Sequence, residues 1–153
     1  MGRLRASLPT LIDDALAIAA PWNCLADHVI YIQQRAADFE TVQSHFAAAH
    51  HRREAEPLMD QLETIEREIQ ERFAQLNERA ARLNFLENDI NQVVTLAAEG
   101  VDDLPADHPA VQKWDRAMRI IDHHLGSAHT TLHYEDASVS LLRASDAANK
   151  LAL

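Results

Sequence analysis

The sequence predicts an all-α fold, an elongated up-down-up bundle of three coiled-coil-like helices with a short extra helix at the N-terminus. Three observations predict this class. The chain has only three glycines and 5% aromatic residues and is rich in Ala, Leu, Glu and Arg, which favour helices. Apolar residues recur every three or four positions over long stretches, as on one face of a helix. No strand-like alternation of similar length competes with this pattern.

The first expected element is a short N-terminal helix within residues 1–21. Ser7 followed by Pro9 is typical of a helix start, and Pro21 ends or kinks the helix. Residues 22–153 are expected to form the long antiparallel bundle, and a chain of 153 residues suits a single domain overall. Because such a rod exposes much surface for its volume, we expect a homodimer that covers apolar strips.

One narrow apolar stripe predicts each of the three long helices. Each stripe keeps its spacing of three or four residues throughout, which is typical of a coiled-coil seam. Acid–base pairs four residues apart, such as Glu63 with Arg67, indicate the solvent-facing sides. The stripes contain Trp22, Leu25, Val29, Ile32, Ala36, Phe39 and Phe46; then Leu62, Ile65, Ile69, Phe73, Leu76, Ala80, Leu83, Leu86, Ile90, Val93 and Ala97; then Val111, Trp114, Met118, Ile121, Leu125, Ala128, Leu132, Val139 and Leu142.

The last long helix is expected to continue across Gly126. A loop at residues 99–109 precedes it, in which Gly100 can close the previous helix in the left-handed conformation and Pro109 fits the first turn of the next. A glycine inside a helix costs about 1 kcal/mol relative to alanine, but the stripe keeps its phase across this one. A break at Gly126 would instead give a four-helix bundle with the histidines at its corner.

The net charge of −10 and the single cysteine narrow the function classes. An acidic chain lacks the positive surface with which general nucleic-acid binders neutralise phosphates. Cys24 has no disulfide partner in the chain, so we expect a small buried residue. Asp13 and Asp14 interrupt the apolar stretch near the N-terminus, and no run of about 18 apolar residues occurs. We therefore expect a cytoplasmic protein that binds neither nucleic acid nor membranes directly.

The stretch DHHLGSAHTTLHYED, residues 122–136, contains four of the nine histidines and suggests a metal site. His129 and His133 are four residues apart, a spacing at which two imidazoles on a helix reach one ion, and Asp136 could add a carboxylate. His50 falls at the same level if the helices fold back on one another. These four residues define the hypothesis of a divalent transition metal such as zinc. The competing interpretation has no cofactor and treats the histidines as hydrogen-bonding residues at the border of the core.

A second motif in the same segment is Arg119 followed by His124, with four residues between them. This spacing resembles the Arg-x4-His motif of the HEPN ribonucleases, which are α-helical bundles whose Arg–His pair usually acts across a dimer. The resemblance covers six residues, and Ile120 stands where the family usually has a polar side chain. It implies, as an alternative function, a ribonuclease with Arg119 and His124 as its catalytic pair.

The function that the sequence favours is a non-enzymatic, acidic, helical interaction protein that self-associates. An adaptor, an assembly accessory and an inhibitor that masks a basic protein surface all fit this class. Glu135 and Asp146 fall where the last stripe expects apolar residues, so these acids either leave the bundle or meet a partner. The alternatives are a histidine/carboxylate metal-binding bundle and the HEPN-like ribonuclease.

Overall fold

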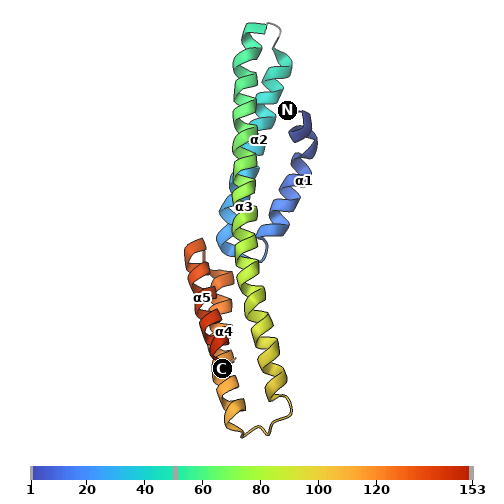
Figure 1. Cartoon of the computed structure of the whole chain (residues 1–153). Coiled ribbons are helices and arrows are strands. Elements are labelled where there is room, and N and C mark those ends of the chain that lie inside the picture. Colours follow the sequence, from blue (N-terminus) through green and yellow to red (C-terminus); the bar gives the residue numbers. More distant parts are fainter. Residues whose placement is uncertain (1, 50–51, 152–153) are drawn as a thin grey trace. The chain divides into compact units, whose positions relative to one another are not determined.

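The computed structural model describes residues 2–49 and 52–151, with side chains for residues 7–49 and 53–151. These residues are almost entirely helical and include no strand, so the predicted all-α class is confirmed (Figure 1). No described helix combines the length and the apolar character needed to cross a bilayer. The elements are α1 (Gly2–Ala19), the 3-10 turn η1 (Asn23–Leu25), α2 (Ala26–Ala48), α3 (Arg52–Val101), α4 (Pro109–Thr130) and α5 (Tyr134–Leu151).

The chain forms two compact units, and α3 contributes to both. The first unit comprises Met1–Ala20 and Leu25–Glu78, and therefore contains α1, α2 and the first half of α3. The second comprises Pro21–Cys24 and Arg79–Leu153, and therefore contains the second half of α3 together with α4 and α5. A single up-down-up bundle over residues 22–153 stays a prediction.

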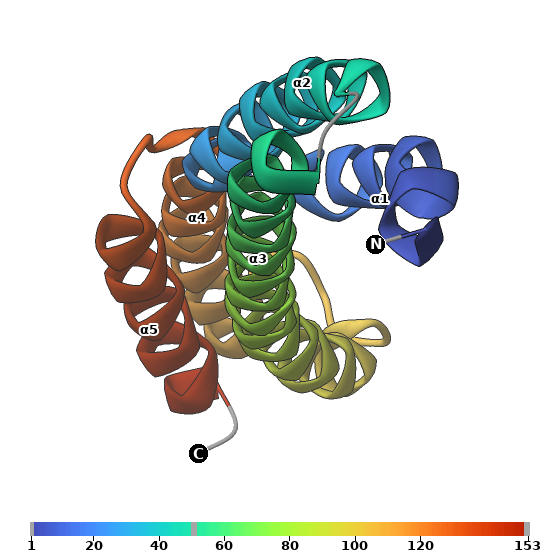
Figure 2. The same ribbon diagram turned by 90° about the horizontal axis from the view of Figure 1, so that it is seen from above.

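In the first unit, α2 runs antiparallel beside the first half of α3, and α1 packs against α2 (Figures 1 and 2). Burial of one apolar stripe per helix holds the unit together, because each large aliphatic side chain removed from water contributes about 1.5–3 kcal/mol. The predicted stripe of the second segment is confirmed here from Leu25 to Phe39, whereas Phe46 is only half-buried. The buried side chains are Leu8, Ala15 and Ala19 of α1, Leu25 of η1, His28, Val29, Ile32, Ala36 and Phe39 of α2, and Leu62, Ile65, Ile69 and Leu76 of α3.

A charged contact at the border of this core joins α2 to α3. Nη2 of Arg35 lies 2.7 Å from Oε2 of Glu68, and the hydroxyl of Tyr31 donates a hydrogen bond to the same oxygen at 3.2 Å. Burial lowers the pKa of the Arg35 guanidinium, but the hydrogen bond to Asp38 and the charge of Glu68 outweigh burial and raise it overall. Arg35 therefore stays charged and fixes the register of the two helices.

In the second unit, α4 and α5 form an antiparallel hairpin beside the second half of α3 (Figure 1). Three alanines on one side of α5 are completely buried, which lets the helix backbones approach closely. Leu141 fills the space between them. The buried side chains of this unit are Trp22 and Cys24, Ala80, Leu83 and Ile90 of α3, Ile121 and Ala128 of α4, and Ala137, Leu141, Ala144 and Ala148 of α5.

The expected continuous last helix is wrong, because the segment folds as α4 and α5. α4 passes through Gly126 as predicted, but it ends at Thr130. The hydroxyl of Thr130 donates a hydrogen bond to the carbonyl of Gly126 at 2.9 Å, and the extended Thr131 accepts one from the backbone N–H of His133 at 3.3 Å. Two successive β-branched residues whose hydroxyls bind the backbone favour ending a helix.

The break changes which side of α5 faces the core. Leu132, Val139 and Leu142 were expected in the buried stripe, but their exposed fractions are 71%, 44% and 47%. The stripe pattern assumed one helical phase from residue 109 to the end. The three-residue connection at 131–133 resets that phase, so that other residues of α5 face the core.

Two prolines lie inside helices, and the start of the first of these helices was expected at Ser7 to Pro9. α1 begins at Gly2, before Pro9, and α3 begins at Arg52, before Pro57. A proline within the second or third turn removes only one backbone hydrogen bond, which the rest of a long helix tolerates.

The connection between α3 and α4 also differs in part from the expectation. Gly100 lies inside α3, which ends at Val101, and no glycine among the described residues has a positive φ. Pro109 is the first residue of α4, as predicted. Nδ1 of His108 accepts a hydrogen bond from the N–H of Ala110 at 3.0 Å and so caps the helix.

Replacement of Ala144 by leucine is expected to destabilise the chain by about 1–3 kcal/mol, because the added carbons have no room at a fully buried position. Ala147→Leu, on a half-buried position of the same helix, is the matched control and should cost clearly less. Urea unfolding followed by circular dichroism measures both. Equal stabilities of the two variants would contradict the close packing of α5.

Candidate functional site

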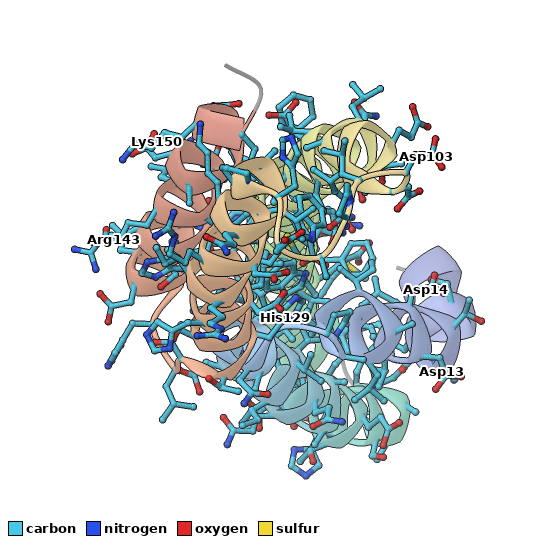
Figure 3. All side chains as sticks on the ribbon, turned by 90° about the horizontal axis from the view of Figure 1, so that it is seen from below. Asp13, Asp14, Asp103, His129, Arg143 and Lys150 are labelled. Atoms are coloured by element: carbon cyan, nitrogen blue, oxygen red, sulfur yellow. The ribbon has the colours of Figure 1, made fainter. Side chains whose placement is uncertain are left out.

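His129 lies in the last turn of α4 and contacts two other parts of the second unit (Figure 3). Its Nδ1 donates a hydrogen bond to the backbone carbonyl of Pro21 at 2.6 Å, since a carbonyl can only accept. Its Nε2 lies 2.6 Å from Oε2 of Glu87, a residue of α3. About two-thirds of each side chain is buried, with exposed fractions of 32% for His129 and 27% for Glu87.

Trp22 completes this arrangement from the opposite side. Its ring stacks on the imidazole of His129 with centroids 4.0 Å apart and an angle of 10° between the planes. The indole N–H donates a hydrogen bond to Oδ1 of Asn84 at 3.0 Å, and only 1% of Trp22 is exposed. We call Pro21, Trp22, Glu87 and His129 the His129 clasp.

The clasp joins three segments that are distant in sequence, because Pro21 and Trp22 precede η1 while Glu87 belongs to α3 and His129 to α4. Asn23 adds a further tie, since its side-chain amide donates a hydrogen bond to the carbonyl of Thr130 at 3.3 Å. Sequence reasoning missed Trp22 and Glu87 as partners of His129. The available signal was the place of Glu87 between Leu83 and Ile90, on the border of an otherwise apolar stripe.

Both ring nitrogens of His129 lie within hydrogen-bond distance of a partner inside the clasp, Nδ1 of the Pro21 carbonyl and Nε2 of the Glu87 carboxylate. Both nitrogens of His129 face hydrogen-bond acceptors, so both contacts are satisfied only when both nitrogens carry a proton. A doubly protonated imidazole stacked on an indole is also a favourable cation–π arrangement.

Of the other residues of the predicted metal site, His133 and Asp136 do not gather around His129. His133 lies in the connection between α4 and α5, and Asp136 lies in the first turn of α5, both exposed. The four-residue helical spacing of His129 and His133 is absent because α4 ends between them. Within residues 2–49 and 52–151, no group of three or more His, Cys, Asp or Glu side chains is placed to hold a metal ion. His50 lies outside the described residues, so the four-residue site stays a prediction.

The residues of the Arg-x4-His motif both lie on α4. Arg119 is exposed and His124 is half-buried. Five residues apart on a helix, they lie roughly 140° from each other around its axis. Their side chains therefore emerge on different sides of α4, and a catalytic pair made from them stays a prediction.

Cys24 is buried, as predicted, with 7% of its surface exposed. Burial raises the pKa of its thiol, and the smaller opposing effects are a backbone hydrogen bond and the charge of Arg79. The Arg79 guanidinium also lies 4.8 Å from the ring centroid of Tyr134. A protonated thiol in this setting is a poor nucleophile.

The second notable feature of this unit is the side of α5 that faces away from its buried alanines. Val139 and Leu142 are adjacent on this side and are exposed. Glu135 and Asp146, one helical turn before and one after the pair, are exposed as well. We call Glu135, Val139, Leu142 and Asp146 the α5 outer face.

Comparison with known proteins does not assign this chain to a family. No family model, curated protein or solved structure matches it.

His129→Ala is expected to lower the free energy of unfolding by about 1–3 kcal/mol, because it removes the hydrogen bond to the Pro21 carbonyl, the 2.6 Å contact with Glu87 and the stacking on Trp22. His123→Ala, at an exposed position of the same helix, should change it by less than about 0.5 kcal/mol. Urea unfolding of both variants measures the difference. A loss no larger for His129→Ala than for His123→Ala would show that the clasp does not stabilise the fold.

The Cys24 thiol is expected to react with a maleimide at least about tenfold more slowly in the folded chain than in urea at the same pH, because burial limits access and disfavours the thiolate. The folded chain favours the protonated form of the Cys24 thiol. The contribution of this buried thiol to the free energy of unfolding is therefore present at neutral pH and is lost as the pH rises through its raised pKa. Mass spectrometry of timed samples measures the reaction. Equal rates with and without urea would contradict the burial of Cys24.

Proposed function

We propose that this chain is an interaction protein that binds another protein through the α5 outer face. The observation that supports this best is the exposed apolar pair Val139 and Leu142, which has an acid one turn away on each side. Large apolar side chains placed together in water are typical of binding surfaces. The alanine side of the same helix already provides its contact with the core, so packing within the unit does not require the pair.

The charged residues around Val139 and Leu142 indicate what kind of surface a partner would present. Glu135 and Asp146 are eleven residues apart on α5, which is about 16 Å along a helix. A complementary partner would present an apolar patch between two basic groups at this separation. Arg143 and Lys150 project outward from α5 along the edge of this face (Figure 3), so an acidic group of the partner at that edge would add specificity.

The overall charge supports the same class of function. A net charge of −10 attracts a basic partner over distances of about a Debye length, roughly 10 Å at 0.1 M salt. An adaptor, an assembly accessory and an inhibitor of a basic surface remain the variants of this proposal. Self-association of the chain and an elongated arrangement of its long helices belong to the same proposal.

The proposal is tested by affinity capture of partners from the native host, with the full chain as bait. The double variant Val139→Ser/Leu142→Ser should lose at least about 90% of a specifically captured protein. Leu132→Ser is the matched control, since it replaces an exposed leucine outside the α5 outer face. Capture that is equal for all three baits would contradict the proposal.

Salt dependence tests the electrostatic part of this proposal separately. The captured complex should weaken by at least about tenfold between about 50 and 500 mM salt, because the acids of the α5 outer face and the net charge contribute to binding. Binding measured by fluorescence anisotropy gives this ratio once the partner is purified. Affinity that does not change over this range would exclude recognition of a basic surface.

A further inference from the structure

A second stripe of residues spaced three and four apart lies on α3, on the side opposite its buried stripe. Its members are Arg82, Phe85, Asp89, Gln92, Leu96 and Glu99, and all six side chains are exposed. At about 100° per residue, five of them lie roughly 110–170° around the helix from the midpoint of the buried Leu83 and Ile90, and Arg82 lies about 90° from it. All six belong to the second unit. We call them the α3 outer face.

Two members of this face are large apolar side chains exposed to an unusual degree. The exposed fractions of Phe85 and Leu96 are 70% and 68%. They are eleven residues apart, which is three helical turns, and so project in nearly the same direction. A shallow groove of about 580 Å³ runs beside Leu96, lined also by Asn88, Asn91, Gln92 and Thr95.

We propose that the α3 outer face binds the same face of a second copy of this chain, with the two helices antiparallel. The proposal names the surface for the self-association included in the proposed function and does not depend on the α5 outer face. In this pairing, Phe85 of each copy packs against Leu96 of the other and enters the groove beside it.

The charges on the face select this arrangement. In the register that pairs Phe85 with Leu96, Arg82 of each copy meets Glu99 of the other, and Asp89 meets Gln92. Every charged residue of the face then meets an opposite charge or an amide that can donate to it. Because the pairing is symmetric, each contact occurs twice.

The parallel arrangement in register places the charges unfavourably. It would set Arg82 against Arg82, Asp89 against Asp89 and Glu99 against Glu99. Like charges directly opposite each other are destabilising in paired helices. The spacing of three and four residues lets the side chains of one helix fill the gaps of the other in either direction, so the charges select the antiparallel one.

The apolar contact is tested by the mass of the full chain in solution. Sedimentation equilibrium over a range of concentrations should show a dimer, and Phe85→Ser should raise its dissociation constant at least about tenfold. Leu132→Ser is the matched control and should leave the constant within about twofold of wild type. A wild-type chain that stays monomeric, or a dimer unaffected by Phe85→Ser, would overturn the proposal.

The register is tested by exchanging charges. Arg82→Glu and Glu99→Arg should each weaken the dimer by several-fold, and the double variant Arg82→Glu/Glu99→Arg should return to within about threefold of wild type. Circular dichroism checks that the variants keep their helical content. A double variant as weak as either single one would exclude the antiparallel pairing.

One further measurement separates dimer formation through the α3 outer face from partner binding through the α5 outer face. Val139→Ser/Leu142→Ser should leave the dimer within about twofold of wild type while it removes partner capture. Loss of the dimer in this double variant would assign self-association to the α5 outer face and overturn the pairing through α3. Partner capture can fail while the charge exchange still rescues the dimer, so the two proposals stand or fall separately.

Discussion

The structure depends on the burial of one narrow apolar stripe along α3. Leu62, Ile69, Leu76, Leu83 and Ile90 are almost completely buried, and they belong to both compact units. A stripe this narrow occupies one side of a helix and leaves the remaining surface in water. Outward-facing sides of the helices are therefore where binding surfaces can form. The exposed Phe85 and Leu96 lie on such a side, opposite the stripe on which the fold depends.

Polar groups contribute where three segments meet beside this stripe. His129 holds the backbone of Pro21, the carboxylate of Glu87 and the ring of Trp22 in one arrangement. Each of these contacts is short, and together they use all the hydrogen-bonding capacity of the imidazole. His129, one of the four residues of the predicted metal site, thus forms contacts that tie three segments of the chain together. The remaining histidines of the stretch 122–136 do not share its environment.

The end of α4 at Thr130 has the largest consequence for function. Because α5 starts in a new helical phase, small residues face the core and the larger Val139 and Leu142 face water. Glu135 and Asp146, which conflicted with a continuous stripe, lie on the exposed side with them. The end of α4 at Thr130 thus explains why Glu135 and Asp146 did not fit the predicted stripe and why Val139 and Leu142 are exposed. These four residues make up the α5 outer face.

The sequence by itself determined the helical class, most of the buried stripes over residues 22–39 and 62–90, the buried Cys24 and the start of α4 at Pro109. These features depend on local periodicity and on side-chain size, which one sequence displays directly. Tertiary structure decided where the last segment breaks, which side of α5 faces the core and which groups surround His129. The hydroxyls of Thr130 and Thr131 compete only weakly with the backbone hydrogen bonds of a helix. Whether residues 109–151 form one continuous helix or a hairpin therefore depends on packing against other helices. The partners of His129 lie 42 and 108 residues away along the chain, a separation that no local pattern encodes.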